Sequence, residues 1–351
     1  MRIVVMGTGG TGGYFGAKLA RAGEDVTFVA RGAHLEAIRA HGLRVKSAID
    51  GEWVVQAPVV ERLGGLPPAD LVLFCVKSFD TDSAGEAVKP VVGRDTAVLP
   101  VQNGVDNVEK LERILGPGHV MGGVAQVLAT IESPGVISHR FLGRMIFGEM
   151  DGRQSERARA FLQACERAGI QAEISSTMLR ALWEKYVLIA AQAGMTALTR
   201  CPAGVVRSVP ETRRMYRAIL GEMVALGNTA GAGLDEGLVD RTMGMLDSMG
   251  AAFTSSLHHD LAQGKPMELE ALHGHAVRLG ERHGIPTPML FAVYAANRTP
   301  ATDAIGWLPR RSCTSPCEPP LDLRCVPDGS VVEDHCRGRE RGVGPHEDVD
   351  V

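Results

Sequence analysis

The sequence predicts an α/β protein in which a Rossmann-type, doubly wound parallel sheet is followed by an all-helical C-terminal domain. A glycine-rich segment stands between a strand pattern and a helix pattern at the start of the chain, and strand and helix patterns then alternate. From Thr177 onward, apolar residues recur at spacings of three and four instead. We expect a dinucleotide-binding domain at residues 1–175, a helical substrate-binding and catalytic domain at 176–299, and a tail at 300–351.

The first thirty-one residues contain the strand, turn, helix and strand of a dinucleotide-binding unit. The predicted strands are Arg2–Met6 and Val26–Ala30, and the predicted helix is Tyr14–Arg21. The G-x-G-x-x-G pattern would let the chain turn tightly, approach a pyrophosphate and pack its helix against the sheet. An ordinary glycine-rich turn is the alternative. The predicted pyrophosphate-binding residues are Gly7, Thr8, Gly9, Gly10, Thr11 and Gly12.

The end of the second strand predicts which dinucleotide binds. An NAD enzyme usually has a carboxylate there, which holds the ribose 2′-hydroxyl. This chain has Arg31, whereas Glu24 and Asp25 precede the strand. A guanidinium suits a 2′-phosphate, which it can grip with two parallel hydrogen bonds. We therefore predict NADPH/NADP⁺, with a solvated surface arginine as the alternative.

The rest of the first domain shows further strand and helix patterns. The predicted strands are Leu43–Lys46 and Trp53–Val55 as a hairpin, then Leu71–Val76, Ala97–Val101, Val120–Val124, Val136–Ser138 and Met145–Gly148. The predicted helices are Ala33–His41, Thr81–Val92, Val105–Leu115 and Gln154–Ala168. Ligands of such sheets lie beyond the carboxyl ends of the strands. Lys77 and Asn103 follow two of these strands, and both become candidates for cofactor contacts. A solvated strand end and a turn former are the alternatives.

The second domain is predicted to consist of helices, and its cleft with the sheet is the expected active site. The helix patterns are Met178–Gly194, Glu211–Gly231, Leu238–Gly250, Leu269–Glu281 and Pro288–Asn297. Lys185 is the last positive charge before an apolar stretch. In a partly dry cleft its pKa would fall toward neutrality and it could donate a proton, although the residues alone favour a lysine that reaches solvent. Ser256 and Glu268 lie at helix starts, where a cap and a charge that complements the helix dipole are the plain explanations.

Composition limits the possible function classes. The chain has 351 residues and a net charge of −4, so no basic field indicates nucleic acid or an anionic membrane. No apolar run reaches the length of a membrane span, and the chain starts with a strand rather than a signal peptide, so we expect a cytoplasmic protein. Cys75, Cys165 and Cys201 are expected to be single core residues. No metal is expected, because His273 and His275 point to different sides of a helix.

These elements together resemble the ketopantoate reductase family (2-dehydropantoate 2-reductase) over about residues 1–297. The resemblance rests on GTGGTGGYFGAKLARAG, VARG, CVKS, QNGVDN, WEKY and SSLHHDLAQGKPMELEALHG followed by GIPTP. It implies reduction of a 2-oxo acid at its ketone with NADPH, and a place in pantothenate biosynthesis. It also implies that hydride passes from the nicotinamide to the substrate while a lysine donates a proton to the ketone oxygen.

The resemblance assigns roles to individual residues. It implies that Lys185 and Glu268 are catalytic, with Glu268 also contacting the cofactor. The implied cofactor contacts further include Arg31, Lys77, Asn103 and, near the nicotinamide, Ala129. The implied substrate contacts are Asn103, Lys185 and Ser256, the last for the carboxylate. Asp260 is assigned a structural role.

The sequence departs from this family at the substrate site and in the tail. Family asparagines that bind substrate are replaced by Ile189, Ala193 and Ala203, and Gln192 is the only amide nearby. We therefore expect a more apolar pocket, which leaves ketopantoate itself open as the substrate. From about Thr299 the chain is rich in proline, arginine and cysteine, and we predict a disordered extension, with a zinc site at Cys313 and Cys317 as the less favoured alternative.

Three functions remain open from the sequence: a reductase of a 2-oxo acid such as ketopantoate, a related β-hydroxyacid or opine-type dehydrogenase with the same architecture and another substrate, and a non-catalytic NADPH sensor. Lys185 and Glu268 favour an enzyme, because a sensor needs no proton donor. The expected partner is a small-molecule 2-oxo acid, and a homodimer is one expectation for the assembly, which the sequence does not settle.

Overall fold

The computed structural model describes residues 1–298. The predicted tail from residue 300, with its candidate zinc ligands Cys313 and Cys317, lies outside the described residues, and the predicted domain boundaries stay predictions. Among the described residues, no helix combines the length and the apolar character that a membrane span needs.

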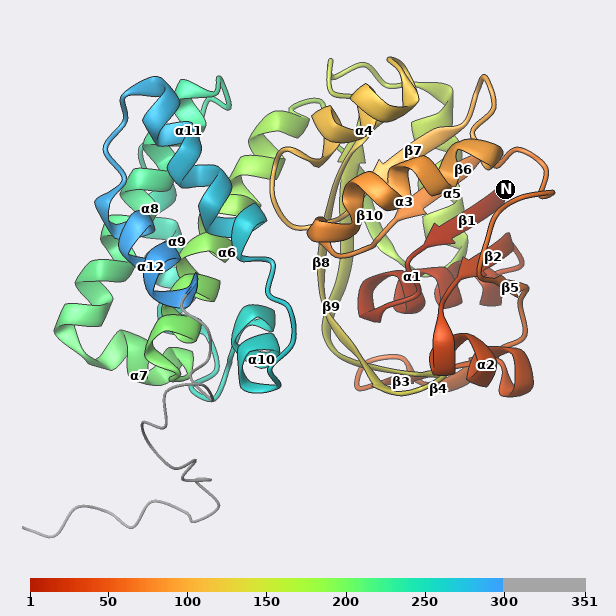
Figure 1. The fold of residues 1–351 in the computed structure, drawn as a ribbon, viewed down its shortest axis with the longest axis horizontal. Coiled ribbons are helices and arrows are strands. Elements are labelled where there is room, and N and C mark those ends of the chain that lie inside the picture. The colour runs from red at the N-terminus through yellow and green to blue at the C-terminus, as the bar shows by residue number, and fades with distance from the viewer. Residues whose placement is uncertain (299–351) are drawn as a thin grey trace, which may run out of the picture. The chain divides into compact units, whose positions relative to one another are not determined.

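A parallel sheet forms the centre of the N-terminal half, as predicted, and it has five strands, four of which were among the predicted ones (Figure 1). Its strands, in spatial order, are β5 (Val59–Val60), β2 (Asp25–Val29), β1 (Arg2–Met6), β6 (Leu71–Phe74) and β7 (Ala97–Pro100). Neighbouring strands pair in parallel throughout. Ligand sites of such sheets lie at the carboxyl edge, which here carries the glycine loop and the residues after β2, β6 and β7.

Helices cover both faces of this sheet because its strands are apolar on both sides. Ile3 and Val5 belong to one core with α1 (Gly10–Arg21) and α5 (Glu156–Arg167). Val4 belongs to another core with α3 (Thr81–Val88) and α4 (Asn107–Leu115). This alternation follows from the two-residue period of a strand. The helix α2 (Gly32–His41) follows β2. A predicted helix over Thr81–Val92 instead ends at Val88 and continues as the 3₁₀ turn Lys89–Val91, since Pro90 lacks the N–H of a regular helix.

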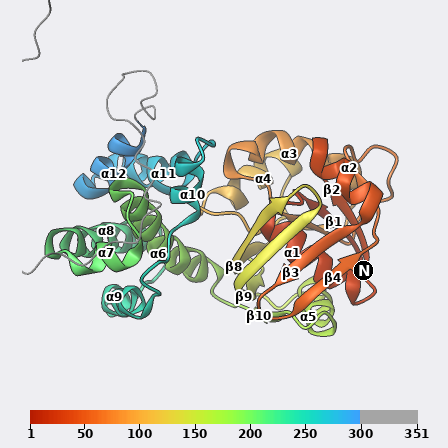
Figure 2. The same ribbon diagram turned by 90° about the horizontal axis from the view of Figure 1, so that it is seen from below.

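A second sheet contains both parallel and antiparallel pairs (Figure 2). It consists of β3 (Leu43–Ser47) and β4 (Gly51–Val55), which form the predicted hairpin, together with β8 (Gly122–Ser133), β9 (Val136–Gly148) and β10 (Gln171–Ile174). The prediction of two short strands at Val136–Ser138 and Met145–Gly148 was wrong, since β9 is continuous. Its middle was not recognisable because Leu142 and Gly143 adopt φ of 59° and 137°, where the register with β8 also shifts.

The C-terminal half of the described chain is helical and has its own hydrophobic core. Its α-helices are α6 (Met178–Thr199), α7 (Ala203–Ser208), α8 (Pro210–Thr229), α9 (Leu238–Ser248), α10 (Ser256–Ala262), α11 (His275–His283) and α12 (Pro288–Arg298). The helix α6 was predicted to end at Gly194, but it continues to Thr199. A Cβ at Gly194 would lie 2.6 Å from His273 Nε2, so this glycine permits close helix packing rather than ending the helix.

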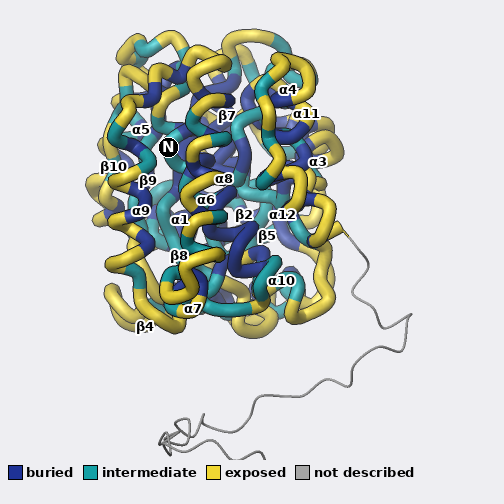
Figure 3. The backbone as a smooth tube through the Cα atoms, turned by 90° about the vertical axis from the view of Figure 1, so that its left-hand side faces the viewer, coloured by how far each residue is buried: buried dark blue, intermediate teal, exposed yellow. Residues whose placement is uncertain are grey.

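The predicted helix over Leu269–Glu281 begins with a π-helical segment, Glu270–Gly274, which leads directly into α11. The Tyr186 hydroxyl donates a 2.9 Å hydrogen bond to the carbonyl of Ala271 and thereby ties α6 to this segment. All of Ala271–Gly274 is buried. Figure 3 colours the buried residues of the described chain dark blue. Such π segments are often found at functional sites.

Candidate active site

The glycine loop between β1 and α1 makes a tight turn, which the G-x-G-x-x-G pattern predicts. Gly7 adopts φ of 99°, which favours glycine. A Cβ at Gly10 would overlap the carbonyl of Ala129 on β8, and a Cβ at Gly12 would overlap the carbonyl of Gly7. A Cβ at Gly9 would meet nothing within 4 Å. The backbone is thus packed tightly behind the loop and is open in front of Gly9, where the α1 N-terminus begins.

The two threonines of the loop differ in what they can offer a ligand. Both the backbone N–H and the hydroxyl of Thr8 donate to the carbonyl of Val29, at 3.1 Å and 2.8 Å. Thr8 is buried and holds the loop against β2, so its predicted cofactor contact cannot use these two donors. Thr11 lies in the first turn of α1 with intermediate exposure.

Arg31 stands at the start of α2, where a 2′-phosphate partner was predicted. Its side chain is 78% exposed, and its Nη2 lies 3.1 Å from Asp80 Oδ2. Asp80 ends the 3₁₀ turn Ser78–Asp80 after β6. Sequence reasoning missed this carboxylate, because no pattern indicated that the segments after β2 and β6 would meet.

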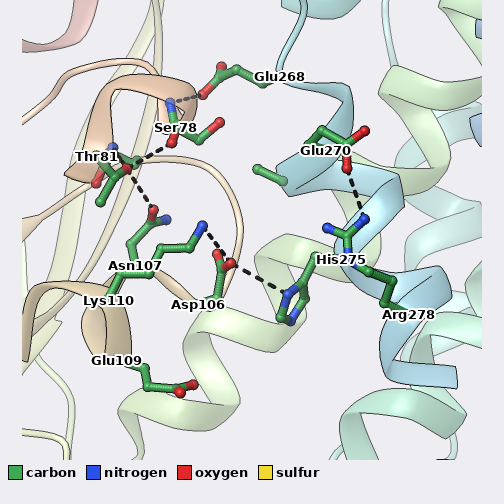
Figure 4. Close-up of polar contacts among 12 residues, drawn as sticks. Ser78, Thr81, Asp106, Asn107, Glu109, Lys110, Glu268, Glu270, His275 and Arg278 are labelled. Carbon is green, nitrogen blue, oxygen red and sulfur yellow. Dashed lines mark hydrogen bonds and ion pairs between the residues drawn. The ribbon is translucent and has the colours of Figure 1, made fainter. Parts of the chain in front are cut away.

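Glu268 connects the helical half of the chain to the carboxyl edge of the parallel sheet. Its Oε1 accepts from the Ser78 N–H at 3.0 Å, as Figure 4 shows. Its Oε2 accepts from Lys77 Nζ at 3.2 Å and from Asn103 Nδ2 at 3.3 Å. The carboxylate is buried, with 6% of the residue exposed. The structure therefore brings together three of the predicted site residues, whereas the expectation from the residues alone was a simple complement to the helix dipole.

Lys77 is also paired with Asp260 of α10, at 2.9 Å. Burial alone would lower the pKa of Lys77, but the charges of Glu268 and Asp260 reverse this effect and raise it. Lys77 is therefore held as a cation between two carboxylates at the edge of the sheet.

Lys185 lies in the first half of α6, close enough to Glu268 for the two charges to interact. Burial lowers the pKa of Lys185 from 10.5 to about 8, and the negative charge of Glu268 opposes this shift. The residue keeps intermediate exposure. In residues 1–298 no hydrogen bond or ion pair engages its ammonium group, so the group is free to donate a proton.

A second polar cluster links α4 to α11 (Figure 4). Asp106 Oδ2 lies 2.7 Å from Lys110 Nζ and 3.4 Å from His275 Nδ1. Burial lowers the pKa of His275, although the Asp106 charge opposes this effect. Sequence reasoning named His275 only as a metal candidate and did not find this cluster. In the described residues, no group of three or more histidine, cysteine, aspartate and glutamate side chains is arranged to hold a metal ion.

The start of α10 is capped by Ser255 rather than by Ser256. The Ser255 hydroxyl accepts from the His258 N–H at 3.1 Å and lies 2.7 Å from Thr196 Oγ1 of α6. Ser256, the predicted carboxylate contact, is the first residue of α10 and is exposed. Its hydroxyl is therefore accessible, whereas that of Ser255 is used within the fold.

The positions predicted to lack polar substrate contacts lie along and after α6. Ile189, one turn beyond Lys185, has intermediate exposure. Ala193 and Ala203 are buried in the helical core. Gln192 is buried, and its Nε2 lies 2.8 Å from the Met249 sulfur. The NH2 group of the only amide that the sequence offered near Lys185 is therefore engaged elsewhere.

Comparison with known proteins agrees with this architecture. The family models "Ketopantoate reductase PanE/ApbA" and its C-terminal counterpart match residues 3–152 and 177–300. A 2-dehydropantoate 2-reductase from Mesorhizobium japonicum is 33% identical, covering 86% of this chain and 98% of its own. The crystal structure of 2-dehydropantoate 2-reductase from Geobacter metallireducens is 31% identical, with a TM-score of 0.80 over 85% of this chain and 99% of its own.

A more distant structure shares the fold alone. D-mandelate dehydrogenase, solved with NADH and anilino(oxo)acetate, is 19% identical, with a TM-score of 0.77 over 85% of this chain and 97% of its own. The two family models and the identity to curated relatives over most of both chains go further than a shared fold. This chain belongs to the ketopantoate reductase family.

Proposed function

We propose that this protein reduces the ketone of 2-dehydropantoate to pantoate with NADPH, as a step in pantothenate and coenzyme A biosynthesis. The proposal depends on Lys185. Its ammonium group has a pKa of about 8 and has no hydrogen-bond or ion-pair partner in residues 1–298. Its charge interacts with that of Glu268, whose carboxylate accepts hydrogen bonds from the segment after β6. A cation with this acidity is suited to protonating an oxygen on which negative charge develops. Family membership supports the reaction class.

The residues of the sheet edge fit a dinucleotide. The space in front of Gly9 would take a pyrophosphate, with Gly7, Gly10, Thr11 and Gly12 completing the loop. Arg31 would hold the 2′-phosphate, and Lys77, Asn103 and Ala129 lie on the elements that border the loop and the strand ends. NADPH, when bound, supplies the hydride.

Lys185 has two tasks in this mechanism. It donates a hydrogen bond to the ketone oxygen, which stabilises the negative charge that grows there, and it then delivers its proton to that oxygen. Glu268 keeps the ammonium protonated at neutral pH, because its charge raises the pKa of Lys185 against the effect of burial. Ser256 is the proposed contact for the substrate carboxylate, and its exposed hydroxyl is accessible for it.

The test is the loss of NADPH absorbance with purified protein and ketopantoate, with NADH in a parallel series. Consumption that requires ketopantoate and disappears in Lys185→Ala, while NADPH still binds, would support the enzyme. The sensor would be favoured by two results together. The wild type would turn over no oxo acid, and Lys185→Ala would bind NADPH as the wild type does.

A second candidate is the reduction of another 2-oxo acid. Ile189 stands one turn from Lys185, Ala193 and Ala203 carry no polar side-chain group, and the Nε2 of Gln192 already contacts the Met249 sulfur. Hydrogen bonds to a substrate hydroxyl give strong discrimination, and a site that lacks them should not reject an analogue without that hydroxyl. We therefore include 2-oxoisovalerate in the assay. A strong preference for ketopantoate over 2-oxoisovalerate would rule this candidate out. A cytoplasmic location and a homodimer stay predictions.

A further inference from the structure

A carboxylate stands directly opposite the arginine that we assign to the 2′-phosphate. Arg31 Nη2 and Asp80 Oδ2 are 3.1 Å apart. We propose that Asp80 sets the preference between NADPH and NADH by competing with the 2′-phosphate for Arg31. This inference rests on the proposed dinucleotide function and adds a specificity-determining residue to it.

The topology of the sheet explains why these two residues meet. The strands β2 and β6 flank β1, so the segments that follow them converge beyond the end of β1, where the glycine loop lies. Arg31 follows β2 directly, and Asp80 belongs to the turn after β6 that also carries Lys77. Both residues therefore belong to the edge at which the dinucleotide is proposed to bind.

The side chain of Asp80 is turned toward Arg31 although a local role was available. Asp80 is the N-cap residue of α3, where aspartate commonly accepts a hydrogen bond from the first turn of the helix. Its side chain makes no such capping bond. Its carboxylate remains 32% exposed and faces a guanidinium that is 78% exposed, so a ligand can reach both groups.

The two groups suit different cofactors. A carboxylate at the end of the second strand is the usual partner of the ribose 2′-hydroxyl in NAD, and an arginine is the usual partner of the 2′-phosphate in NADP. Asp80 belongs to the turn after β6, but its carboxylate lies beside the arginine that follows the second strand. A 2′-phosphate must take Arg31 from Asp80 and then lie near a second negative charge. The uncharged 2′-hydroxyl of NADH does not need Arg31 and is not repelled by Asp80, and it can donate a hydrogen bond to the Asp80 carboxylate. Asp80 therefore weakens the binding of NADPH selectively.

The experiment measures dissociation constants of NADPH and NADH with the full-length protein, by nicotinamide fluorescence at low ionic strength. Asp80→Asn keeps a good N-cap residue, so the fold should be unaffected. The variant should bind NADPH about three- to tenfold more tightly, the range expected for removing one exposed charge close to a phosphate. NADH binding should stay the same or weaken.

Asp82→Asn is the matched control. Asp82 lies in the first turn of the same helix and is exposed, and in the described part of the chain it takes part in no ion pair. An equal gain in NADPH affinity in both variants would overturn the proposal, since the effect would then be one of general charge. The gain from Asp80→Asn should also shrink in an Arg31→Ala background, because the competition acts through Arg31.

The outcomes distinguish a failure of the Asp80 role from a failure of the proposed dinucleotide-binding function. If Arg31→Ala removes the preference for NADPH while Asp80→Asn changes nothing, the role of Asp80 is wrong and the cofactor assignment stands. If the wild-type protein binds neither dinucleotide, the proposed function fails and the role of Asp80 fails with it.

Discussion

Replacing Lys185 with methionine should make the protein more stable and nearly inactive. Burial lowers the pKa of Lys185 from 10.5 to about 8. Since a tenfold change in an equilibrium corresponds to about 1.4 kcal/mol, holding this ammonium charged in the folded protein costs about 3 kcal/mol at pH 7. The residue keeps intermediate exposure, so we expect Lys185→Met to raise the free energy of unfolding by about 1–3 kcal/mol. Loss of the proton donor should lower kcat by about 10²–10⁴-fold.

The assays are urea unfolding at pH 7 and pH 10, and kcat for the oxo acid that the wild type reduces. Between the two pKa values the folded lysine loses its proton before the unfolded one does, so the wild type gains stability as pH rises. The difference in the free energy of unfolding between variant and wild type should therefore be largest at pH 7 and small at pH 10. Lys89→Met, at an exposed lysine, is the control and should change neither quantity. A variant less stable than the wild type at pH 7, or one that keeps its kcat, would refute the reasoning.

Three further predictions concern single substitutions. Glu268→Gln removes a charge that raises the pKa of Lys185, so the decline of kcat at alkaline pH should begin at lower pH; an unchanged pH profile would contradict the assigned coupling. Gly10→Ala places a methyl group against the backbone of β8 and should lower both the melting temperature and the affinity for NADPH. In Gly9→Ala the added Cβ has no atom within 4 Å, so only NADPH binding should weaken. Equal melting temperatures for the two variants would contradict this prediction. Gly194→Ala places a Cβ 2.6 Å from a buried imidazole nitrogen and should cost about 2 kcal/mol or more in urea unfolding; a loss below about 0.5 kcal/mol would show that the helices can separate freely.

The parts of the fold that depend on local pattern could be predicted from the sequence. Four of the five parallel strands and the glycine turn follow from apolar runs and from backbone chemistry that only glycine allows. The two-residue strand β5 was not predicted, because Val59–Val60 is too short to form a recognisable pattern. The continuous β9 could not be predicted, because Leu142 and Gly143 adopt positive φ in its middle, supported by the pairing with β8. The continuation of α6 past Gly194 depends on the packing of His273, which is distant in sequence.

The candidate site shows the same division. The strand-end residues Lys77 and Asn103 were predicted from topology, because the carboxyl ends of parallel strands gather at one edge. That both of them donate to Glu268 depends on how the helical half of the chain folds back, which no local pattern reports. The pair of Arg31 and Asp80 was missed for a similar reason. Arg31 was predicted as a partner of the 2′-phosphate, but no sequence pattern indicated Asp80, and the order of the strands brings the two residues together.

The carboxylate of Glu268 links the pKa of Lys185 to the hydrogen bonds at the ends of the strands. Its two oxygens receive donors from the segments after two neighbouring strands, and the same charge acts on Lys185. Each donor that is withdrawn leaves more of the carboxylate's negative charge uncompensated, and the proton on Lys185 is then held more firmly. The pKa of Lys185 therefore depends on the hydrogen bonds that Lys77, Ser78 and Asn103 donate to Glu268.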